Sequence, residues 1–256
     1  VKVSVAAGKD SNNNNNNSNN NNSNNNNNKN NSSNNTNTST SNNSNTGNKN
    51  NTGTNAGNTN AGTDAKTPED GTKVTDKKTK SVYVFKNGAV VYTGTTDAKA
   101  KTVTVKASVT VDGVTYKVTS IADGAFRKMK NLTKVTIGAN IKTIGKNAFS
   151  GCAKLTTVTV GKNVTSIGNK AFYNCTALKS VIIPSKVTKI GKSAFEKCKN
   201  LSTITIKTRK LKQSSVGANA LKGTAKNATV KVPAKSLKAY SQFLYKKGLS
   251  KKAEIE

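Results

Sequence analysis

The 256-residue sequence contains no histidine, no tryptophan and only three cysteines, and its 11 acidic residues are far outnumbered by 42 Lys and Arg. Without histidine, the chain cannot form a Ser/His or Cys/His nucleophile pair. The only acids in the central part, Asp123 and Glu196, do not make a carboxylate pair of the glycosidase type. No glycine-rich phosphate-binding pattern occurs either. We therefore predict a protein that is not an enzyme, has no cofactor and has no small-molecule substrate.

The cysteines do not have the spacing of a metal site. Cys152, Cys175 and Cys198 are evenly and widely spaced (175 − 152 = 198 − 175 = 23), and the chain has no C-x-x-C pair. Met129 stands at the same interval before Cys152 (152 − 129 = 23), and thus at the same position of the pattern. Because methionine and buried cysteine are both medium-sized apolar side chains, we predict that this position belongs to the core.

The N-terminal quarter has almost nothing apolar to bury. Residues 1–10 are interpreted as the end of a signal peptide or of a preceding region. Residues 11–63 are almost wholly Asn, Ser, Thr and Gly, which predicts a disordered Asn-rich linker. No run of 18 apolar residues exists, so no transmembrane segment is predicted. A flexible spacer favours an exposed, extracellular binding head.

What the sequence does contain is a 23-residue unit, written four times without a gap between residues 118 and 206. Phenylalanine and leucine recur at this spacing, as Phe126, Phe149, Phe172 and Phe195, and as Leu132, Leu155, Leu178 and Leu201. Constant spacing without insertions indicates that each unit forms one coil of a stack. Such a stack offers a surface for binding.

Each unit combines two apolar patterns. The first, L-x-x-V-x-I, predicts a short strand with one buried face, and the second is an apolar pair such as Ile141 and Ile144. Gly145, Gly168 and Gly191 follow the second pair and suggest a tight corner. An Ala-Phe pair then begins a short helical or turn segment. Equivalent side chains should stack about 4.8 Å apart, the spacing of neighbouring strands. The predicted fold is a leucine-rich-repeat solenoid of short parallel strands.

The pattern I-x-x-I-G-x-x-A-F-x-x-C-x-x-L-x-x-V-x-I, as in residues 141–160, resembles the BspA-type leucine-rich repeat family. The resemblance covers residues 118–206, with Met129 replacing Cys in the first unit. It implies a bacterial protein, secreted or at the cell surface, that adheres to host matrix, mucin or other cells. Its partner would be a host or bacterial surface macromolecule, either protein or glycan.

Both ends of the repeats are predicted to be capped. In residues 64–117, Asn87-Gly88 and Asp112-Gly113 separate β-rich runs and predict two hairpins. Residues 207–256 form a degenerate fifth unit and a helix with a stripe of Leu237, Tyr240 and Leu244, an N-cap at Ser236 and a stop at Gly248. A basic membrane-surface helix is the alternative interpretation of this helix.

A hydroxyl-rich strip is the candidate ligand-binding site. Residues that lie between the buried strand positions should face outward on the sheet, where solenoids commonly bind partners. The alternative is a solvated strand face, because threonine favours strands in any case. The candidate residues are Thr133, Lys134, Thr136, Thr156, Thr157, Thr159, Lys179, Ser180, Ile182, Ser202, Thr203 and Thr205.

The formal net charge of +31 belongs mostly to the repeats and the C-terminal end. Residues 118–206 hold 15 basic and 2 acidic residues (15 − 2 = +13), and residues 207–256 hold 13 and 2 (13 − 2 = +11). Such a field attracts polyanions. A second hypothesis is therefore an envelope-associated structural protein held on anionic cell-wall polymers. Nonspecific nucleic-acid binding is a third, weakened by having only two arginines and few aromatics, and solubility alone is the remaining alternative. We expect a monomer.

Overall fold

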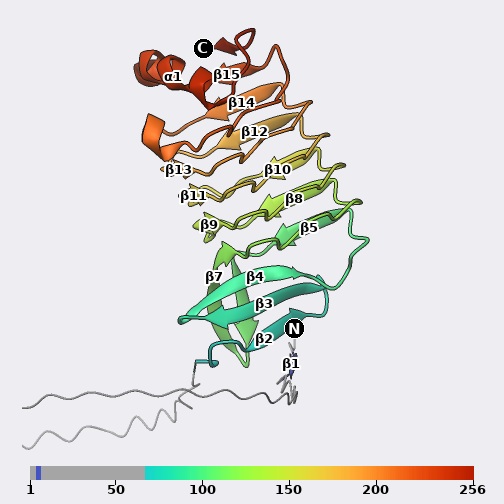
Figure 1. The fold of residues 1–256 in the computed structure, drawn as a ribbon. Helices are drawn as coiled ribbons and strands as arrows, with labels where there is room; N and C mark the ends of the chain where they lie inside the picture. Colours follow the sequence, from blue (N-terminus) through green and yellow to red (C-terminus); the bar gives the residue numbers. More distant parts are fainter. Residues whose placement is uncertain (1–3, 7–66) are drawn as a thin grey trace, which may run out of the picture. The chain divides into compact units, whose positions relative to one another are not determined.

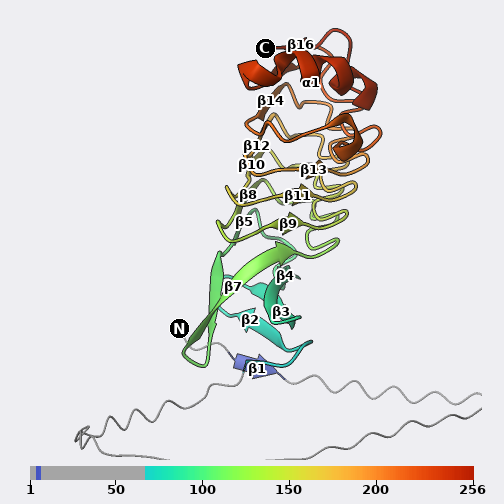
Figure 2. The same cartoon turned by 90° about the vertical axis from the view of Figure 1, so that its left-hand side faces the viewer.

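The computed structural model describes residues 4–6 and 67–256. Residues 67–256 wind into coils that stack on one another (Figures 1 and 2). We number coils one to four from the repeat units that begin at Val118, Ile141, Val164 and Val187. The expected linker at 11–63 and most of the expected N-terminal segment at 1–10 lie outside the described residues.

The L-x-x-V-x-I pattern of each coil forms the first row of parallel strands. Equivalent residues pair across neighbouring coils, as in Val135 with Val158 and Val181 with Ile204. Alternate residues of β8, β12 and β14, such as Val135 and Ile137, are buried, while the residues between them face outward. The strands are β5 (Thr102–Val105), β8 (Lys134–Ile137), β10 (Thr157–Thr159), β12 (Ser180–Ile183), β14 (Thr203–Ile206), β15 (Thr229–Lys231) and β16 (Glu254–Ile255).

The second apolar pair of each coil forms a second row of parallel strands. Ile121, Ile144, Ile167 and Ile190 pair in register along it, and a single bridge joins Ile190 to Val216 of the fifth unit. The remainder of each coil consists of turns. The strands are β7 (Val114–Ile121), β9 (Thr143–Ile144), β11 (Ser166–Ile167) and β13 (Lys189–Ile190).

The segment before the repeats forms hairpins at the two expected turns. Asn87-Gly88 joins β3 to β4 and Asp112-Gly113 joins β6 to β7, with positive φ at all four residues. Such φ angles suit two-residue hairpin turns. The other strands are β1 (Ser4–Ala6), β2 (Lys73–Asp76), β3 (Ser81–Lys86), β4 (Ala89–Thr95) and β6 (Ser108–Val111).

This segment also extends both rows of strands. β4 pairs in parallel with β7, and β5 pairs in parallel with β8. Sequence reasoning missed β5 as a first-row strand because the interval from Val103 to its partner Val135 (135 − 103 = 32) is longer than the repeat period. The hairpin of β6 and β7 lies in this interval, so the period is hidden there.

The core is a set of stacked columns, one for each apolar position of the unit. Phe126, Phe149, Phe172 and Phe195 are buried, and successive rings lie 4.7, 5.0 and 5.1 Å apart between centroids. Tyr92 of β4 continues the column, 5.0 Å from Phe126. The leucine column is buried in the same way. Stacking at the expected spacing is therefore confirmed.

The fixed glycines have a different role from the expected one. Gly145, Gly168 and Gly191 were predicted to permit a tight corner, but none of them has positive φ. Instead, a Cβ on Gly168 would lie 2.7 Å from the carbonyl carbon of Gly145, and a Cβ on Gly191 would lie 2.4 Å from the backbone nitrogen of Asn169. Glycine is needed because backbones of neighbouring coils approach too closely for any side chain.

The C-terminal end carries a helix, α1 (Leu237–Leu244), between the 3₁₀ turns η2 (Ala234–Ser236) and η3 (Tyr245–Lys247); η1 (Gln213–Ser215) lies earlier. Tyr240 and Leu244 of the expected stripe are buried, but Leu237 is exposed and Phe243 is buried instead. Ser236 occupies the N-cap position without making a side-chain cap bond, because η2 leads directly into the helix. Gly248 follows η3 with φ of 96°.

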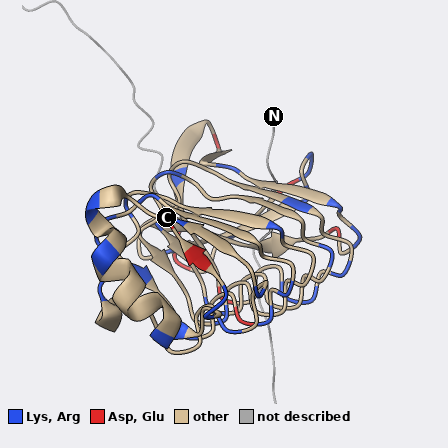
Figure 3. Ribbon diagram, turned by 90° about the horizontal axis from the view of Figure 1, so that it is seen from above, with Lys and Arg blue, Asp and Glu red and all other residues tan. Residues whose placement is uncertain are grey.

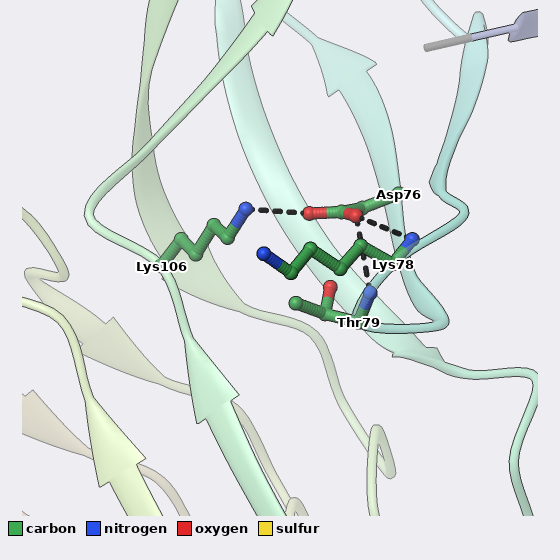
Figure 4. A network of polar contacts seen from close by, with 4 residues as sticks. All are labelled: Asp76, Lys78, Thr79 and Lys106. Atoms are coloured by element: carbon green, nitrogen blue, oxygen red, sulfur yellow. Dashed lines mark hydrogen bonds and ion pairs between the residues drawn. The ribbon is translucent and has the colours of Figure 1, made fainter. Parts of the chain in front are cut away.

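A partly buried ion pair joins Asp76, the last residue of β2, to Lys106, the residue that follows β5 (Figure 4). The Asp76 carboxylate accepts a hydrogen bond from Lys106 Nζ at 2.6 Å and from the backbone N–H groups of Lys78 and Thr79. Burial pushes the pKa of Asp76 upward, but the hydrogen bonds from Lys106 and Thr79 outweigh burial and lower the pKa from 3.8 to about 2. The ionised carboxylate therefore stabilises the folded chain.

Replacing Asp76 with asparagine should lower the free energy of unfolding at pH 7 by about 2 kcal/mol, the value of the pKa difference between unfolded and folded states. Because the folded pKa is the lower one, this stabilisation is complete above about pH 4 and is lost as the pH falls toward about 2. Urea unfolding from pH 7 to pH 2 measures it. The difference in the free energy of unfolding between wild type and Asp76→Asn should disappear at low pH. A difference that stays constant with pH would contradict the prediction.

Candidate functional site

The exposed side of the first row is the surface on which the predicted ligand strip lies. Lys134, Thr136, Thr157, Thr159, Ser180, Ile182, Thr203 and Thr205 alternate with buried residues along β8, β10, β12 and β14. Because the strands lie side by side in register, the structure brings these eight residues together on one face. We call this surface the first-row face.

The residues just before the strands also have a structural role. The hydroxyls of Thr133, Thr156 and Ser202 each donate a hydrogen bond to a backbone carbonyl of the preceding coil, at 2.9, 3.0 and 3.4 Å. Their protons are therefore used to join coils. Lys179 has the equivalent position in coil three and is exposed. Of the twelve predicted residues, these three hydroxyls are the least free to donate to a ligand.

The first row is interrupted between coils two and three. β10 ends one hydrogen-bonded ladder and β12 begins the next, although the two strands lie side by side (Figure 1). On either side of this break, the residues just before the strands are joined by backbone hydrogen bonds. The N–H of Thr156 donates to the carbonyl of Thr133 at 2.9 Å, and the N–H of Ser202 donates to the carbonyl of Lys179 at 3.0 Å. The break is thus local to β10 and β12.

Two sequence features coincide with the break. Pro184 follows β12 at the position that glycine holds in coils one and two, and proline has no N–H to donate to the neighbouring coil. Gly138, at the equivalent position, does donate to Val105 at 2.9 Å. In addition, β10 ends at Thr159, and Val160 is only half-buried, whereas its equivalents Ile137 and Ile183 are buried.

A depression of about 500 Å³ lies at the break. Ile182 is among its lining residues, and the 49% exposure of this side chain is the highest among the large hydrophobic side chains of the described residues. Hydroxyls of Thr157, Thr159 and Ser180 stand beside it. Sequence reasoning named Ile182 and these three hydroxyl residues but missed the rest of the lining. Pro184, which replaces the glycine of the earlier coils, was the one sequence feature that could have indicated the depression. The missed residues include Val160, Lys162, Pro184, Ser185 and Lys207.

A second, smaller hollow lies at the corner between the two rows. Lys117, Lys142 and Lys186 line it, with Asn140, Asn163, Thr119 and Thr165, and no acidic residue is among its lining. Lys186 Nζ donates to Asn163 Oδ1 at 2.6 Å, and the amides of Asn140 and Asn163 donate to backbone carbonyls of preceding coils. We call this surface the corner groove.

The three cysteines form a buried column. Each thiol donates to a phenylalanine carbonyl of the preceding coil, at 3.0 to 3.1 Å. Burial raises the pKa of Cys152 to about 12, so its reactive thiolate form is scarce at neutral pH. The core interpretation of this position is confirmed. Within residues 67–256, no three Cys, Asp or Glu side chains come together in a way that could hold a metal ion.

Positive charge surrounds the described coils. Figure 3 shows Lys and Arg distributed around the stack and along α1, with few Asp and Glu between them. In that same part of the chain, none of the helices has the length and apolar character needed to cross a membrane.

A comparison with one solved structure of similar fold supports the leucine-rich-repeat fold, and two further solved structures are similar over part of the chain. A Treponema pallidum (T. pallidum) leucine-rich repeat protein is 25% identical, with a TM-score of 0.55, covering 62% of this chain and 71% of that one. One from Bacteroides capillosus is 27% identical, with a TM-score of 0.44, covering 50% and 94%. A leucine-rich cell surface protein from Faecalibacterium prausnitzii is 24% identical, with a TM-score of 0.44, covering 64% and 55%.

The repeats themselves identify the family. A comparison with curated proteins finds no match. Residues 114–249, more than half of the 256, match the BspA type leucine-rich repeat region, in 6 copies. This match continues past the four regular units to residue 249, which agrees with the fifth unit that the structure adds after them. The chain therefore belongs to the BspA-type leucine-rich repeat family.

Proposed function

We propose that this chain is a non-catalytic binding protein, secreted or at a bacterial cell surface, whose first-row face adheres to a macromolecule of a host matrix, mucin or another cell. The observation that carries the proposal is Ile182, an aliphatic side chain left 49% exposed in a depression at the centre of that face. The equivalent position is threonine in coils one, two and four. An isolated aliphatic side chain in a hollow rimmed by hydroxyls suits a partner with a complementary apolar group.

The test replaces Ile182 with threonine, the residue that the neighbouring coils use. Burial of an aliphatic side chain contributes about 1.5–3 kcal/mol, and since Ile182 is already half-buried, we expect binding to weaken about tenfold. Fibronectin, mucin and purified cell wall, at about 50 and about 500 mM salt, are the immobilised partners. Leu237→Thr is the matched control, because it removes the other exposed large hydrophobic, on α1. Equal effects of the two substitutions would contradict the proposal.

The corner groove supports a second candidate function, attachment to anionic cell-wall polymers. Its three lysines come from β7 (Lys117), coil two (Lys142) and coil three (Lys186), and no carboxylate lines the groove, so a linear polyanion would meet only positive charge there. Changing Lys117, Lys142 and Lys186 together to glutamine should lower retention on purified cell wall at about 100 mM salt several-fold. The control changes Lys128, Lys154 and Lys226, which are exposed elsewhere. Equal losses from both triple variants would show that net charge, and not this groove, holds the protein.

A further inference from the structure

We propose that the depression at Ile182 holds an extended acidic peptide segment of a partner protein, with an aliphatic side chain on Ile182 and carboxylates at Lys162 and Lys207. This inference rests on the proposed function, because it names the partner of the same site. Three properties of the depression carry it: its apolar lining residues, the sign of its charge and its hydroxyl groups.

Part of the lining of the depression is apolar, and the volume of about 500 Å³ has room for one aliphatic side chain. Ile182, Pro184 and the half-buried Val160 line it together with the strand residues Val158 and Val181. An apolar hollow with a few hydroxyls around it suits one aliphatic group held in a fixed orientation.

The charge at the rim has one sign. Lys162 of coil two and Lys207 of coil four flank coil three, and no Asp or Glu lines the depression. Two coil spacings of about 4.8 Å place the two positions about 10 Å apart along the stack. In an extended peptide, residues two before and two after a central residue face the same side and lie about 13 Å apart. A peptide that crosses the coils can therefore place an aliphatic side chain against Ile182 and a carboxylate near each lysine.

The polar side chains of the depression favour a peptide over a purely apolar ligand. Hydroxyls of Thr157, Thr159, Ser180 and Ser185 line it and supply both donors and acceptors. The amide groups of an extended peptide, each with one donor and one acceptor, can form hydrogen bonds with such a set of side chains.

The fifth unit provides an internal comparison. Pro233 stands where Pro184 stands, and a depression of about 280 Å³ lies beside it. No large hydrophobic side chain is exposed among its lining residues. Its Lys231 already pairs with Glu256, at 2.9 Å. Proline at this position thus accompanies a depression in both coils, but only the depression at Pro184 combines an exposed aliphatic side chain with lysines that pair with no acid of the described chain.

The experiment measures binding of the full chain to a fluorescent synthetic peptide with one leucine between pairs of glutamates. Two matched probes replace the leucine with serine, or the glutamates with glutamine. We expect each matched probe to bind at least tenfold more weakly than the first. The double variant Lys162→Gln with Lys207→Gln, and separately Ile182→Thr, should show the same loss, while Lys128→Gln with Lys154→Gln should bind as wild type does. Far-ultraviolet circular dichroism establishes that every variant is folded.

The outcomes separate this inference from the proposed function. If the peptide fails to bind, or binds equally with serine in place of leucine, the peptide assignment is overturned, and the proposed function survives provided that Ile182→Thr still weakens macromolecule binding. If the two lysine pairs have equal effects, bare charge is responsible and the assignment also falls. A hyaluronan fragment that binds more tightly than the peptide, and is lost in the same variants, would assign the site to an acidic glycan instead.

Discussion

Replacing Phe172 with alanine is expected to lower the free energy of unfolding by about 4 kcal/mol, because truncating a buried phenylalanine leaves a cavity that the surroundings only partly fill. Phe172 is fully buried, and its ring lies between those of Phe149 and Phe195, at 5.0 and 5.1 Å, with an interplanar angle of 3° to each. Collapse of the cavity would require two coils to approach each other, which their backbone ladders resist.

Removing the Phe172 ring should also change how the stack of coils unfolds. In a solenoid each coil is stabilised by its immediate neighbours, so a weakened interface in the middle separates the stack into two less coupled parts. Urea unfolding of Phe172→Ala, followed by circular dichroism and by hydrogen exchange, should therefore show a lower midpoint and weaker cooperativity. Tyr173→Ala is the matched control: Tyr173 is only partly buried, and its ring contacts Lys170 and Lys197 at the surface. A control loss as large as that of Phe172→Ala would contradict the core assignment.

The regular part of this fold could be predicted from the sequence because each coil repeats the same physical solution. The apolar side chain at one position stacks on its own equivalents one repeat period away, so Phe on Phe and Leu on Leu follow directly from the spacing. Prediction fails where the period changes. β5 was hidden by the hairpin that separates Val103 from Val135, and the fifth unit follows at a longer interval, as in Ile204 with Val230 (230 − 204 = 26).

The candidate site could likewise be predicted from the sequence only in part. The alternation of buried and exposed residues was enough to place Thr157, Ser180 and Ile182 on one face. The depression was not predictable from alternation, because it depends on one strand ending early and on Pro184 having no N–H. The corner groove was also missed, since Lys142 and Lys186 come from positions just outside the strands, where the repeat pattern tolerates Lys, Asn or Thr, and Lys117 of β7 precedes the first repeat unit.

The second large effect is expected at Gly168, where alanine should lower the free energy of unfolding by about 3 kcal/mol, the upper part of the range for forcing an extra methyl group into a packed site. The added Cβ would lie 2.7 Å from the carbonyl carbon and 2.8 Å from the carbonyl oxygen of Gly145. Both atoms belong to a backbone that is itself held in the ladder, so no flexible side chain can move aside. The second row would have to separate at this coil.

Gly151→Ala distinguishes this explanation from the conformational one. Gly151 has φ of 77°, and an added Cβ there would meet nothing closer than 3.5 Å. Replacing Gly151 with alanine should therefore lower the free energy of unfolding by about 1 kcal/mol, because only the strain of a left-handed backbone conformation is added. Thermal unfolding of both variants decides between the two roles of glycine. If Gly168→Ala were no more destabilising than Gly151→Ala, close approach of the coils would not be the reason for the fixed glycine. If it is more destabilising, then a side chain at this position limits how closely the coils can stack. Coil one tolerates Ala122 at this position because it lies at the start of the repeats, where its neighbour is β4 and not a regular coil.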